Sequence, residues 1–249
     1  MSDRGGESQR PRLSIAAPCY NEAEGIADLL EEWDGILNRF PFESEIVICN
    51  DGSTDASGVI LKEAQSRYPR LRVVELERNS GYGQALCAAL RSTRGEFIAT
   101  IDSDGQFDLA DAERLLAVAV EEGCELVTGY RSRKQDTAVR VLANHGLNLV
   151  VRALFGVKLR DTNCALKVAR ADVLRDLEIE ASSWATPTEI CLRVHALGFR
   201  IREVSVRHRN RVLGTSKVRT WNAAWGFLRY LIYMRLKLHL YRSDILNQP

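Results

Sequence analysis

The sequence lacks several patterns that define common protein classes. Its six cysteines contain no Cys-x-x-Cys pair and are spread along 249 residues, mostly inside apolar runs. This spacing argues against a zinc cluster or a disulfide framework and indicates reduced core thiols in a cytosolic protein. The four histidines also lack the spacing of metal ligands. Residues 1–12 contain no apolar segment, so we expect a disordered lead there, neither a signal peptide nor an anchor.

Acidic residues are absent between Val204 and Ser243, where nine lysines and arginines occur. Removing these nine from the 34 basic residues leaves 25 basic against 33 acidic, although the whole chain has a net charge of only +1. A basic stretch on an acidic body favours a polyanion or an anionic surface as partner. We expect that partner to be a membrane surface, with no nucleic acid.

Short apolar runs alternate with longer amphipathic segments through most of the chain. The runs predict strands over 13–17, 45–49, 72–76, 97–101 and 126–130, and the segments predict helices over 25–39, 55–68, 82–93, 109–122 and 138–155. A less regular section follows, with a helix over 188–197 and a strand over 200–206. This order is typical of an α/β fold in which a mostly parallel sheet is flanked by helices.

Unusual residues, most of them polar, gather where the predicted strands end, which is where ligands bind in open parallel sheets. They are Pro18, Tyr20, Asn21 and Glu22, then Asn50 to Ser53, then Arg78 and Asn79, and finally Asp102 to Gln106. Asp55 and Asp108 are explained as helix caps or residues just before them. Capping is a poor account of Asp51, Asp102 and Asp104 together. Two carboxylates one residue apart can turn toward one point, which favours Mg²⁺ or Mn²⁺ bound to a diphosphate.

Four segments resemble the nucleotide-sugar half of family 2 glycosyltransferases, which have the GT-A (Rossmann-like) fold. They are APCYNEAEGI, VICNDGSTDAS, RNSGYGQALCAALRSTRGEFIATIDSDGQFD and VTGYRSR. Within the family, the chain is most similar to dolichol-phosphate mannose synthases and polyprenyl-phosphate glucosyltransferases. The resemblance covers roughly 13–217, and such an ordered series is far more specific than Asp-x-Asp alone.

The resemblance implies a donor site for a nucleotide sugar of the GDP-mannose or UDP-glucose type. The residues implied for this donor are Pro18, Tyr20, Glu22, Asp51, Arg78, Asp102, Ser103 and Asp104. Asp51 would accept hydrogen bonds from the base. Asp102, Asp104 and Gln106 would hold the metal, Mg²⁺ or Mn²⁺.

The resemblance also implies an acceptor site for a lipid phosphate. Its residues are Arg131, Arg140, Asn144, Arg211, Ser216 and Lys217, the last three within an Arg-x-x-Gly-x-Ser-Lys element. Asn144 departs from the small hydroxyl residue that the family often has. Arg131 and Asp161 join Asp102 and Asp104 as candidate catalytic residues, and Asp161 either orients the sugar or orders its loop. Glu189 matches a family position too, but a salt bridge on a helix face explains it equally well.

These expectations describe an inverting, metal-dependent hexosyltransferase that acts on a polyprenyl or dolichyl phosphate. Two alternatives stay open: transfer to a hydroxyl group with Asp161 or Glu189 as the base, and a non-catalytic module that binds a nucleotide sugar. We expect a transferase domain over 13–219, divided at 130 and 131 into nucleotide-sugar and acceptor halves.

The remaining 220–249 form a basic tail, expected as an amphipathic helix on the cytoplasmic face of a membrane. Phe227, Leu231, Met234, Leu238 and Tyr241 share one apolar stripe of this tail. The stripe predicts contact with lipid. Packing on the body, a homodimer seam or a small membrane-protein partner is the alternative.

Overall fold

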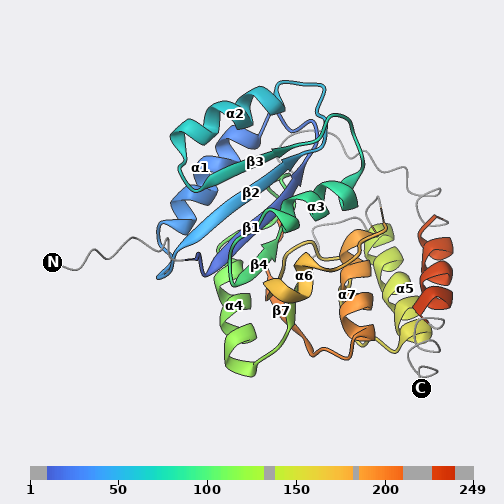
Figure 1. The fold of residues 1–249 in the computed structure, drawn as a ribbon. Helices are drawn as coiled ribbons and strands as arrows, with labels where there is room; N and C mark the ends of the chain where they lie inside the picture. Colours follow the sequence, from blue (N-terminus) through green and yellow to red (C-terminus); the bar gives the residue numbers. More distant parts are fainter. Residues whose placement is uncertain (1–9, 132–137, 182–184, 210–225, 239–249) are drawn as a thin grey trace, which may run out of the picture.

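One mixed sheet organises the protein in the computed structural model, which describes residues 10–131, 138–181, 185–209 and 226–238. Its strand order is β3-β2-β1-β4-β6-β5-β7 (Figure 1). The strands are β1 (Leu13–Cys19), β2 (Ser44–Asn50), β3 (Leu71–Glu75), β4 (Phe97–Thr100), β5 (Leu126–Arg131), β6 (Lys167–Arg170) and β7 (Ile201–Val206). The helices are α1 (Ile26–Leu37), α2 (Ser57–Arg67), α3 (Tyr82–Arg91), α4 (Asp111–Glu122), α5 (Ala138–Phe155), α6 (Ala171–Arg175) and α7 (Thr186–Ala196).

Every pairing in the sheet is parallel except those of β6, which runs antiparallel to both β4 and β5. The predicted α/β class and mostly parallel sheet are therefore confirmed. The sequence pattern missed β6 and α6, which together cover only 167–175. Asp55 and Asp108 accept backbone N–H bonds from Ser57 and Ala110, so each forms a short turn just before its helix.

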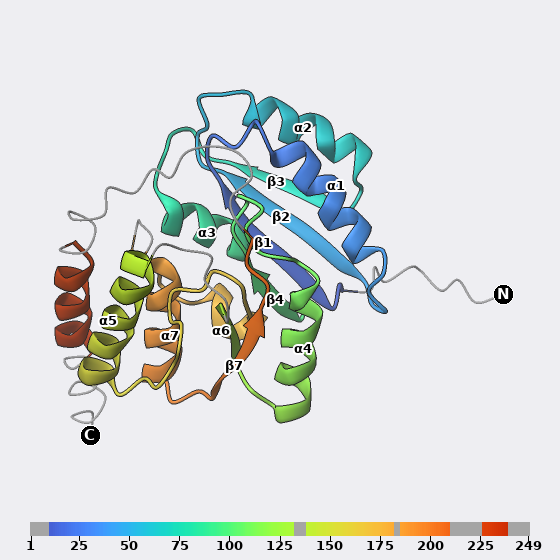
Figure 2. The same ribbon diagram turned by 180° about the vertical axis from the view of Figure 1, so that it is seen from behind.

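Helices cover both faces of the sheet (Figures 1 and 2). On one face, side chains of β1 and β2 pack with α1 and α4, and Trp33 of α1 is fully buried there. On the other face, alternate side chains of the same strands pack with α3, α6 and α7. All six cysteines are buried and unpaired, as the sequence predicted. The core is therefore split into two apolar layers by the sheet.

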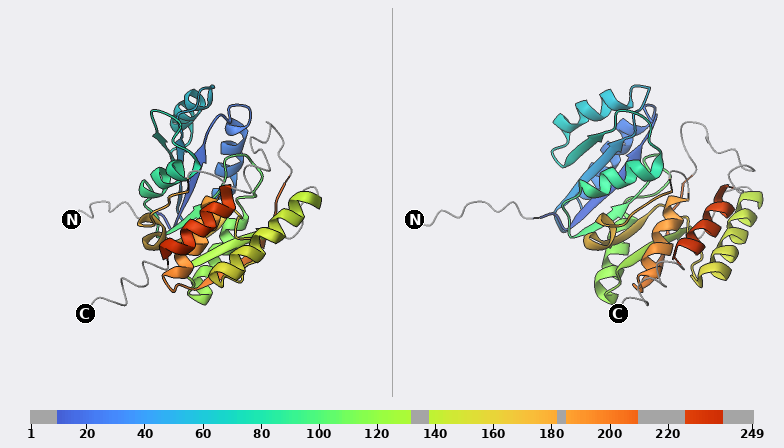
Figure 3. Two further views of the ribbon diagram at one scale, coloured as in Figure 1. Left: turned by 90° about the vertical axis from the view of Figure 1, so that its right-hand side faces the viewer. Right: turned by 45° about the vertical axis from the view of Figure 1, so that its right-hand side comes forward.

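A third apolar cluster joins α5, α7 and a helix over 226–238, which lie side by side (Figure 3). Phe227 and Leu231 belong to this cluster, and Met234 is fully buried as well. The predicted stripe therefore packs on the body of the protein, and the prediction that it contacts lipid is wrong for these three residues. Leu238 also lies in this helix and is half-buried, whereas Tyr241 lies outside the described residues. The burial of an apolar face supplies the driving force for this docking.

Glu180 fastens the same helix to the chain just before α7. Its carboxylate accepts hydrogen bonds from Tyr233, Lys237 and Arg193. Burial alone would raise the pKa of Glu180, but these donors lower it to about 2. The ion pairs keep Glu180 charged at neutral pH. Across the described part of the chain, no helix combines the length and the apolar character that crossing a membrane requires.

Candidate active site at the carboxyl ends of the strands

A cavity of about 440 Å³ opens at the carboxyl ends of β1, β2, β4 and β5. Seven of the eight predicted donor residues line it: Pro18, Tyr20, Glu22, Asp51, Asp102, Ser103 and Asp104. Gln106 and Arg131 line it too, so predicted donor, metal and acceptor residues meet in one cavity. Parallel strands bring their carboxyl ends to one edge, which is why segments far apart in the sequence converge here.

The loops after β1 and β2, which contribute Tyr20, Glu22 and Asp51 to the cavity, hold each other in place. Asn21 adopts a left-handed conformation, with φ of 54°, and its side chain exchanges hydrogen bonds with Thr54. Asparagine tolerates this conformation better than most residues. The Ser103 hydroxyl donates to the carbonyl of Pro18 at 2.7 Å, which ties the end of β4 to the end of β1. These contacts fix the backbone that carries Tyr20 and Glu22.

Asp51 is buried at the end of β2 and holds the loop that leads into α3. One of its carboxylate oxygens accepts the backbone N–H of Ser80 at 2.7 Å, and the other accepts that of Gly81 at 3.0 Å. A carboxylate offers about four lone-pair sites, so each oxygen keeps capacity for another donor. Asp51 can therefore order this loop and also accept a hydrogen bond from a nucleobase.

Asp102 and Asp104 place two carboxylates against the same cavity. Burial and the nearby Asp104 carboxylate raise the pKa of Asp102 to about 7. The Tyr82 hydroxyl donates to Asp102 Oδ1 at 2.7 Å. Burial and the Asp102 charge raise the pKa of Tyr82 well above its usual range, so the phenol remains a donor at neutral pH. The pair is thus a site of concentrated negative charge.

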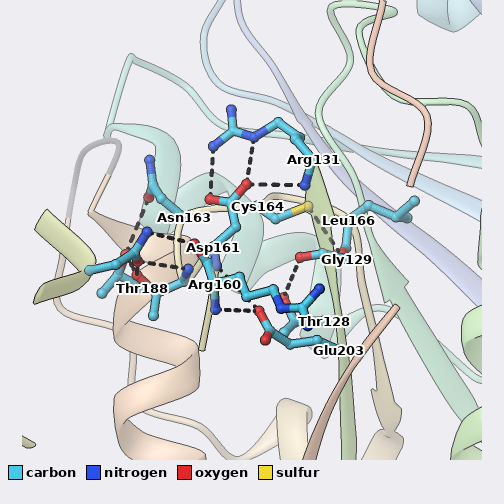
Figure 4. Close-up of polar contacts among 12 residues, drawn as sticks. Thr128, Gly129, Arg131, Arg160, Asp161, Asn163, Cys164, Leu166, Thr188 and Glu203 are labelled. Carbon is cyan, nitrogen blue, oxygen red and sulfur yellow. Dashed lines mark hydrogen bonds and ion pairs between the residues drawn. The ribbon is translucent and has the colours of Figure 1, made fainter. Parts of the chain in front are cut away.

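Arg131 lies at the cavity with its guanidinium held by Asp161 (Figure 4). Nε and Nη2 of Arg131 donate to the two Asp161 oxygens at 2.7 and 2.9 Å. The Asp161 side chain is only 2% exposed, and the Arg131 side chain is 16% exposed. Asp161 does not line the cavity. Its contacts are those of a residue that orients Arg131.

The loop that carries Asp161 is itself held from three elements. Glu203 of β7 accepts the backbone N–H groups of Arg160 and Asp161 (Figure 4). Asn148 of α5 accepts from the Thr162 backbone and hydroxyl. Lys167 of β6 is fully buried, and its Nζ donates to Thr128 and to the carbonyl of Thr162. This network gives Asp161 a single orientation.

The other predicted residues either do not line the cavity or fall outside the part of the chain that the structure describes. Arg78 is exposed and does not line it. Arg140 and Asn144 belong to α5, but their side chains fall outside the described part, and so do Arg211, Ser216 and Lys217 entirely. Glu189 is buried in α7, where it accepts from the backbone of Glu180 and Ala181 and from Arg193 one helical turn on. These contacts match the salt-bridge alternative.

Several cavity residues were missed by the sequence prediction. They are Cys19, Gly81, Tyr82, Phe107, Asn163, Pro187 and His208. Asn79, which the sequence pattern placed at a strand end without a role, lines the cavity too, and Gly81 follows the same strand end, so its position was a usable signal. His208 pairs with Phe107 across a β-bridge, with ring centroids 5.0 Å apart. That contact joins residues about a hundred positions apart, and no local pattern predicts it.

The donor set at the end of β4 fits a hard divalent cation. It combines the carboxylates of Asp102 and Asp104 with the side-chain amide of Gln106, all at the cavity. Within the described ranges, no group of three or more His, Cys, Asp or Glu side chains is placed to hold a metal ion, so this site has only two carboxylates to offer. Mg²⁺ and Mn²⁺ suit such a partial site, because phosphate oxygens and water complete their coordination.

The sheet and its helical layers are those of the GT-A glycosyltransferases. The mycobacterial glucosyl-3-phosphoglycerate synthase from Mycobacterium tuberculosis, solved with uridine diphosphate, matches with a TM-score of 0.67 at 22% identity. The match covers 92% of this chain and 80% of that structure. A second structure of that synthase, with Mn²⁺, UDP-glucose and phosphoglyceric acid, gives a TM-score of 0.65 at 20% identity. These likenesses establish the fold.

A model of the family described as "Glycosyl transferase family 2" matches residues 14–173. The dodecaprenyl-phosphate galacturonate synthase of Rhizobium johnstonii is 31% identical over 92% of this chain and 69% of its own length. The undecaprenyl-phosphate 4-deoxy-4-formamido-L-arabinose transferase of Pseudomonas fluorescens is 31% identical over 82% of this chain, which spans only 59% of that relative. The chain belongs to glycosyl transferase family 2, as its motifs predicted.

The buried pair of Asp161 and Arg131 should contribute strongly to stability. We expect Asp161→Ala to lower the free energy of unfolding by about 3–5 kcal/mol, because it removes two charge-assisted hydrogen bonds from a largely buried guanidinium. Asp172→Ala is the matched control, since the Asp172 and Arg170 side chains are 61% and 54% exposed. It should cost less than about 1 kcal/mol. Urea unfolding followed by circular dichroism measures both, and equal losses would contradict this account.

Proposed function

We propose that this protein transfers a hexose from a nucleotide sugar to a polyprenyl phosphate, with inversion at the anomeric carbon. One observation carries the proposal: a single cavity joins the acidic pair Asp102 and Asp104 to the guanidinium of Arg131. The acidic pair suits a metal-bound diphosphate, and an oriented guanidinium suits a phosphate. The names of the relatives, both polyprenyl-phosphate sugar enzymes, support this choice of acceptor.

On the donor side, Pro18, Tyr20, Glu22 and Asp51 would receive the nucleoside, and Asp102, Asp104 and Gln106 would hold Mg²⁺ or Mn²⁺. A bound cation there would offset the charge that develops on the leaving diphosphate. The neighbouring structure with Mn²⁺ and UDP-glucose supports a donor of this kind. UDP-glucose and GDP-mannose are the two donors to test.

A phosphate acceptor is already ionised near neutral pH, since its second pKa is about 6. One of its oxygens can attack the anomeric carbon as the bond to the nucleoside diphosphate breaks, and no strong base is needed. The main work of the site is then alignment and charge stabilisation. Arg131, oriented by Asp161, would bind the acceptor phosphate together with Arg140, Asn144, Arg211, Ser216 and Lys217.

Transfer to a hydroxyl group would need a carboxylate base at the acceptor. Asp161 and Glu189 are the two candidates, and both are occupied by other contacts. Asp161 holds Arg131, and Glu189 is fully buried with backbone and Arg193 donors. Neither residue lines the cavity. This arrangement favours the phosphate acceptor over the hydroxyl acceptor.

A direct assay tests the acceptor. The protein is incubated with Mn²⁺, radiolabelled UDP-glucose or GDP-mannose, and either a short polyprenyl phosphate or the same polyprenol without phosphate. We expect labelled lipid from the phosphate only, because the polyprenol lacks the ionised oxygen. Comparable product from the polyprenol would contradict the phosphate proposal, and no transfer from a wide donor panel would favour a binding module.

The raised pKa of Asp102 predicts a pH-dependent affinity for the cation. Protons compete with the cation for this carboxylate, and the protonated fraction grows as the pH falls below about 7. The apparent Kd for Mn²⁺ should therefore rise by up to about tenfold per pH unit between pH 7 and pH 5. Titration by electron paramagnetic resonance with saturating nucleotide diphosphate measures it, with the free nucleotide titrated over the same range as control. Asp104→Ala should abolish the binding, and a flat profile would contradict the assignment.

We further propose a peripheral position on an anionic membrane, through the outward face of the helix over 226–238. Ile232 and Leu236 are 50% and 61% exposed on this face, and Arg229 and Arg235 are exposed as well. Leu149 of the adjacent α5 is 68% exposed. Apolar side chains between arginines suit the interface of anionic lipid, where each basic residue adds about 1 kcal/mol.

Liposome flotation tests this face. The wild type should float with vesicles that contain phosphatidylglycerol, and Ile232→Glu with Leu236→Glu should reduce the floating fraction severalfold. Val59→Glu is the matched control, because Val59 is an equally exposed apolar residue at 61%, on α2. Unchanged flotation of the double variant would exclude this face as the contact.

A further inference from the structure

Tyr82 is the first residue of α3 and lines the candidate active site. Its hydroxyl donates to Asp102 Oδ1 at 2.7 Å, the normal length for a strong bond from a hydroxyl to a carboxylate. This contact joins two separate segments of the chain: Tyr82 begins α3, which follows β3, and Asp102 lies in the loop after β4. Tyr82 is therefore placed to set the orientation of that carboxylate.

The backbone on both sides of Tyr82 is held firmly. Asp51 accepts the N–H groups of Ser80 and Gly81, the two residues directly before it. Gly81 has a φ of 92°, a conformation that only glycine adopts readily. On the other side, a Cβ on Gly83 would lie 1.8 Å from the carbonyl oxygen of Ala181, so α3 is packed tightly against that loop. The backbone that carries the Tyr82 ring is therefore held on both sides.

Asp102 needs such a fixed donor, because it stands beside a second carboxylate. Two neighbouring carboxylates repel each other and would turn apart in the absence of an opposing contact. A neutral hydroxyl holds one oxygen of Asp102 and adds no positive charge that would compete with a cation. Partners of this kind, which bind a metal ligand and not the metal, orient the ligand and tune its affinity.

We propose that Tyr82 is a positioning residue that presents Asp102 to the divalent cation, and that Ser80, Gly81 and Tyr82 connect the nucleobase end of the donor site to its metal end. The inference rests on the proposed cation site at Asp102 and Asp104. It adds a chain of contacts from Asp51 through this segment to Asp102. A nucleotide that orders Asp51 would by this route also order the metal ligand.

The test compares Tyr82→Phe with Tyr233→Phe in the full chain. Both wild-type hydroxyls donate to a carboxylate at 2.7 Å, but Tyr233 contacts Glu180, away from the cavity. Mn²⁺ binding is titrated by electron paramagnetic resonance with saturating UDP or GDP, whichever the wild type binds more tightly. We expect Tyr82→Phe to raise the Kd for Mn²⁺ by about 10–100-fold and to alter the spectrum of the bound ion. Tyr233→Phe should change neither.

Two further measurements separate the outcomes. Nucleotide affinity without metal should stay within about threefold of wild type in Tyr82→Phe, and an equal loss there would mean general collapse of the site and overturn the proposal. Asp102→Asn reports on the cation site itself. If Asp102→Asn weakens Mn²⁺ binding and Tyr82→Phe does not, the positioning role of Tyr82 is wrong but the proposed cation site stands. If Asp102→Asn binds Mn²⁺ like the wild type, the proposed cation site fails as well.

Discussion

Repulsion between two carboxylates at the end of β4 is the constraint around which the site is arranged. Asp102 and Asp104 line one cavity, and burial together with the nearby Asp104 charge raises the pKa of Asp102 to about 7. Such a pair is stable only with partners that offset its charge. Tyr82 supplies a hydroxyl donor from α3, and the positive charge of Arg131 also favours the ionised form of Asp102. A divalent cation would offset the remaining negative charge of the pair. We therefore expect the metal and the diphosphate to bind more tightly together than either does alone.

Much of the architecture follows from local sequence patterns, because each strand and helix buries a face of regular period. The short strand β6 escaped prediction for a physical reason. It begins with Lys167, which looks like a surface residue but is fully buried, with its charge satisfied by Thr128 and the carbonyl of Thr162. Those partners come from a different strand and a loop. A local sequence pattern cannot show that distant residues accept hydrogen bonds from a lysine and so allow it to be buried.

In the candidate site, too, the residues marked by a local sequence pattern were predictable, and those placed by tertiary contacts were not. Asp51, Asp102 and Asp104 were predictable because each follows a strand, and parallel strands end at one edge. Tyr82 was not, since an aromatic residue at the start of a helix is usually a core residue. The stripe of Phe227, Leu231 and Met234 shows a related limit. Periodicity correctly identified one apolar face, but the surface that covers it, formed with α5 and α7, depends on tertiary packing.

The pairing of Arg131 with Asp161 also constrains how an acceptor phosphate can bind. Asp161 takes two of the five N–H donors of the guanidinium and offsets much of its charge. Arg131 would therefore orient the acceptor phosphate through its hydrogen bonds more than attract it by net charge. A doubly charged phosphate needs further cations, and the basic stretch after Val204, which has no acidic residue up to Ser243, is where the sequence concentrates them. The carboxylates of Asp102 and Asp104 would then bind the donor through its metal, while the basic stretch would add the positive charge that the acceptor phosphate needs beside Arg131.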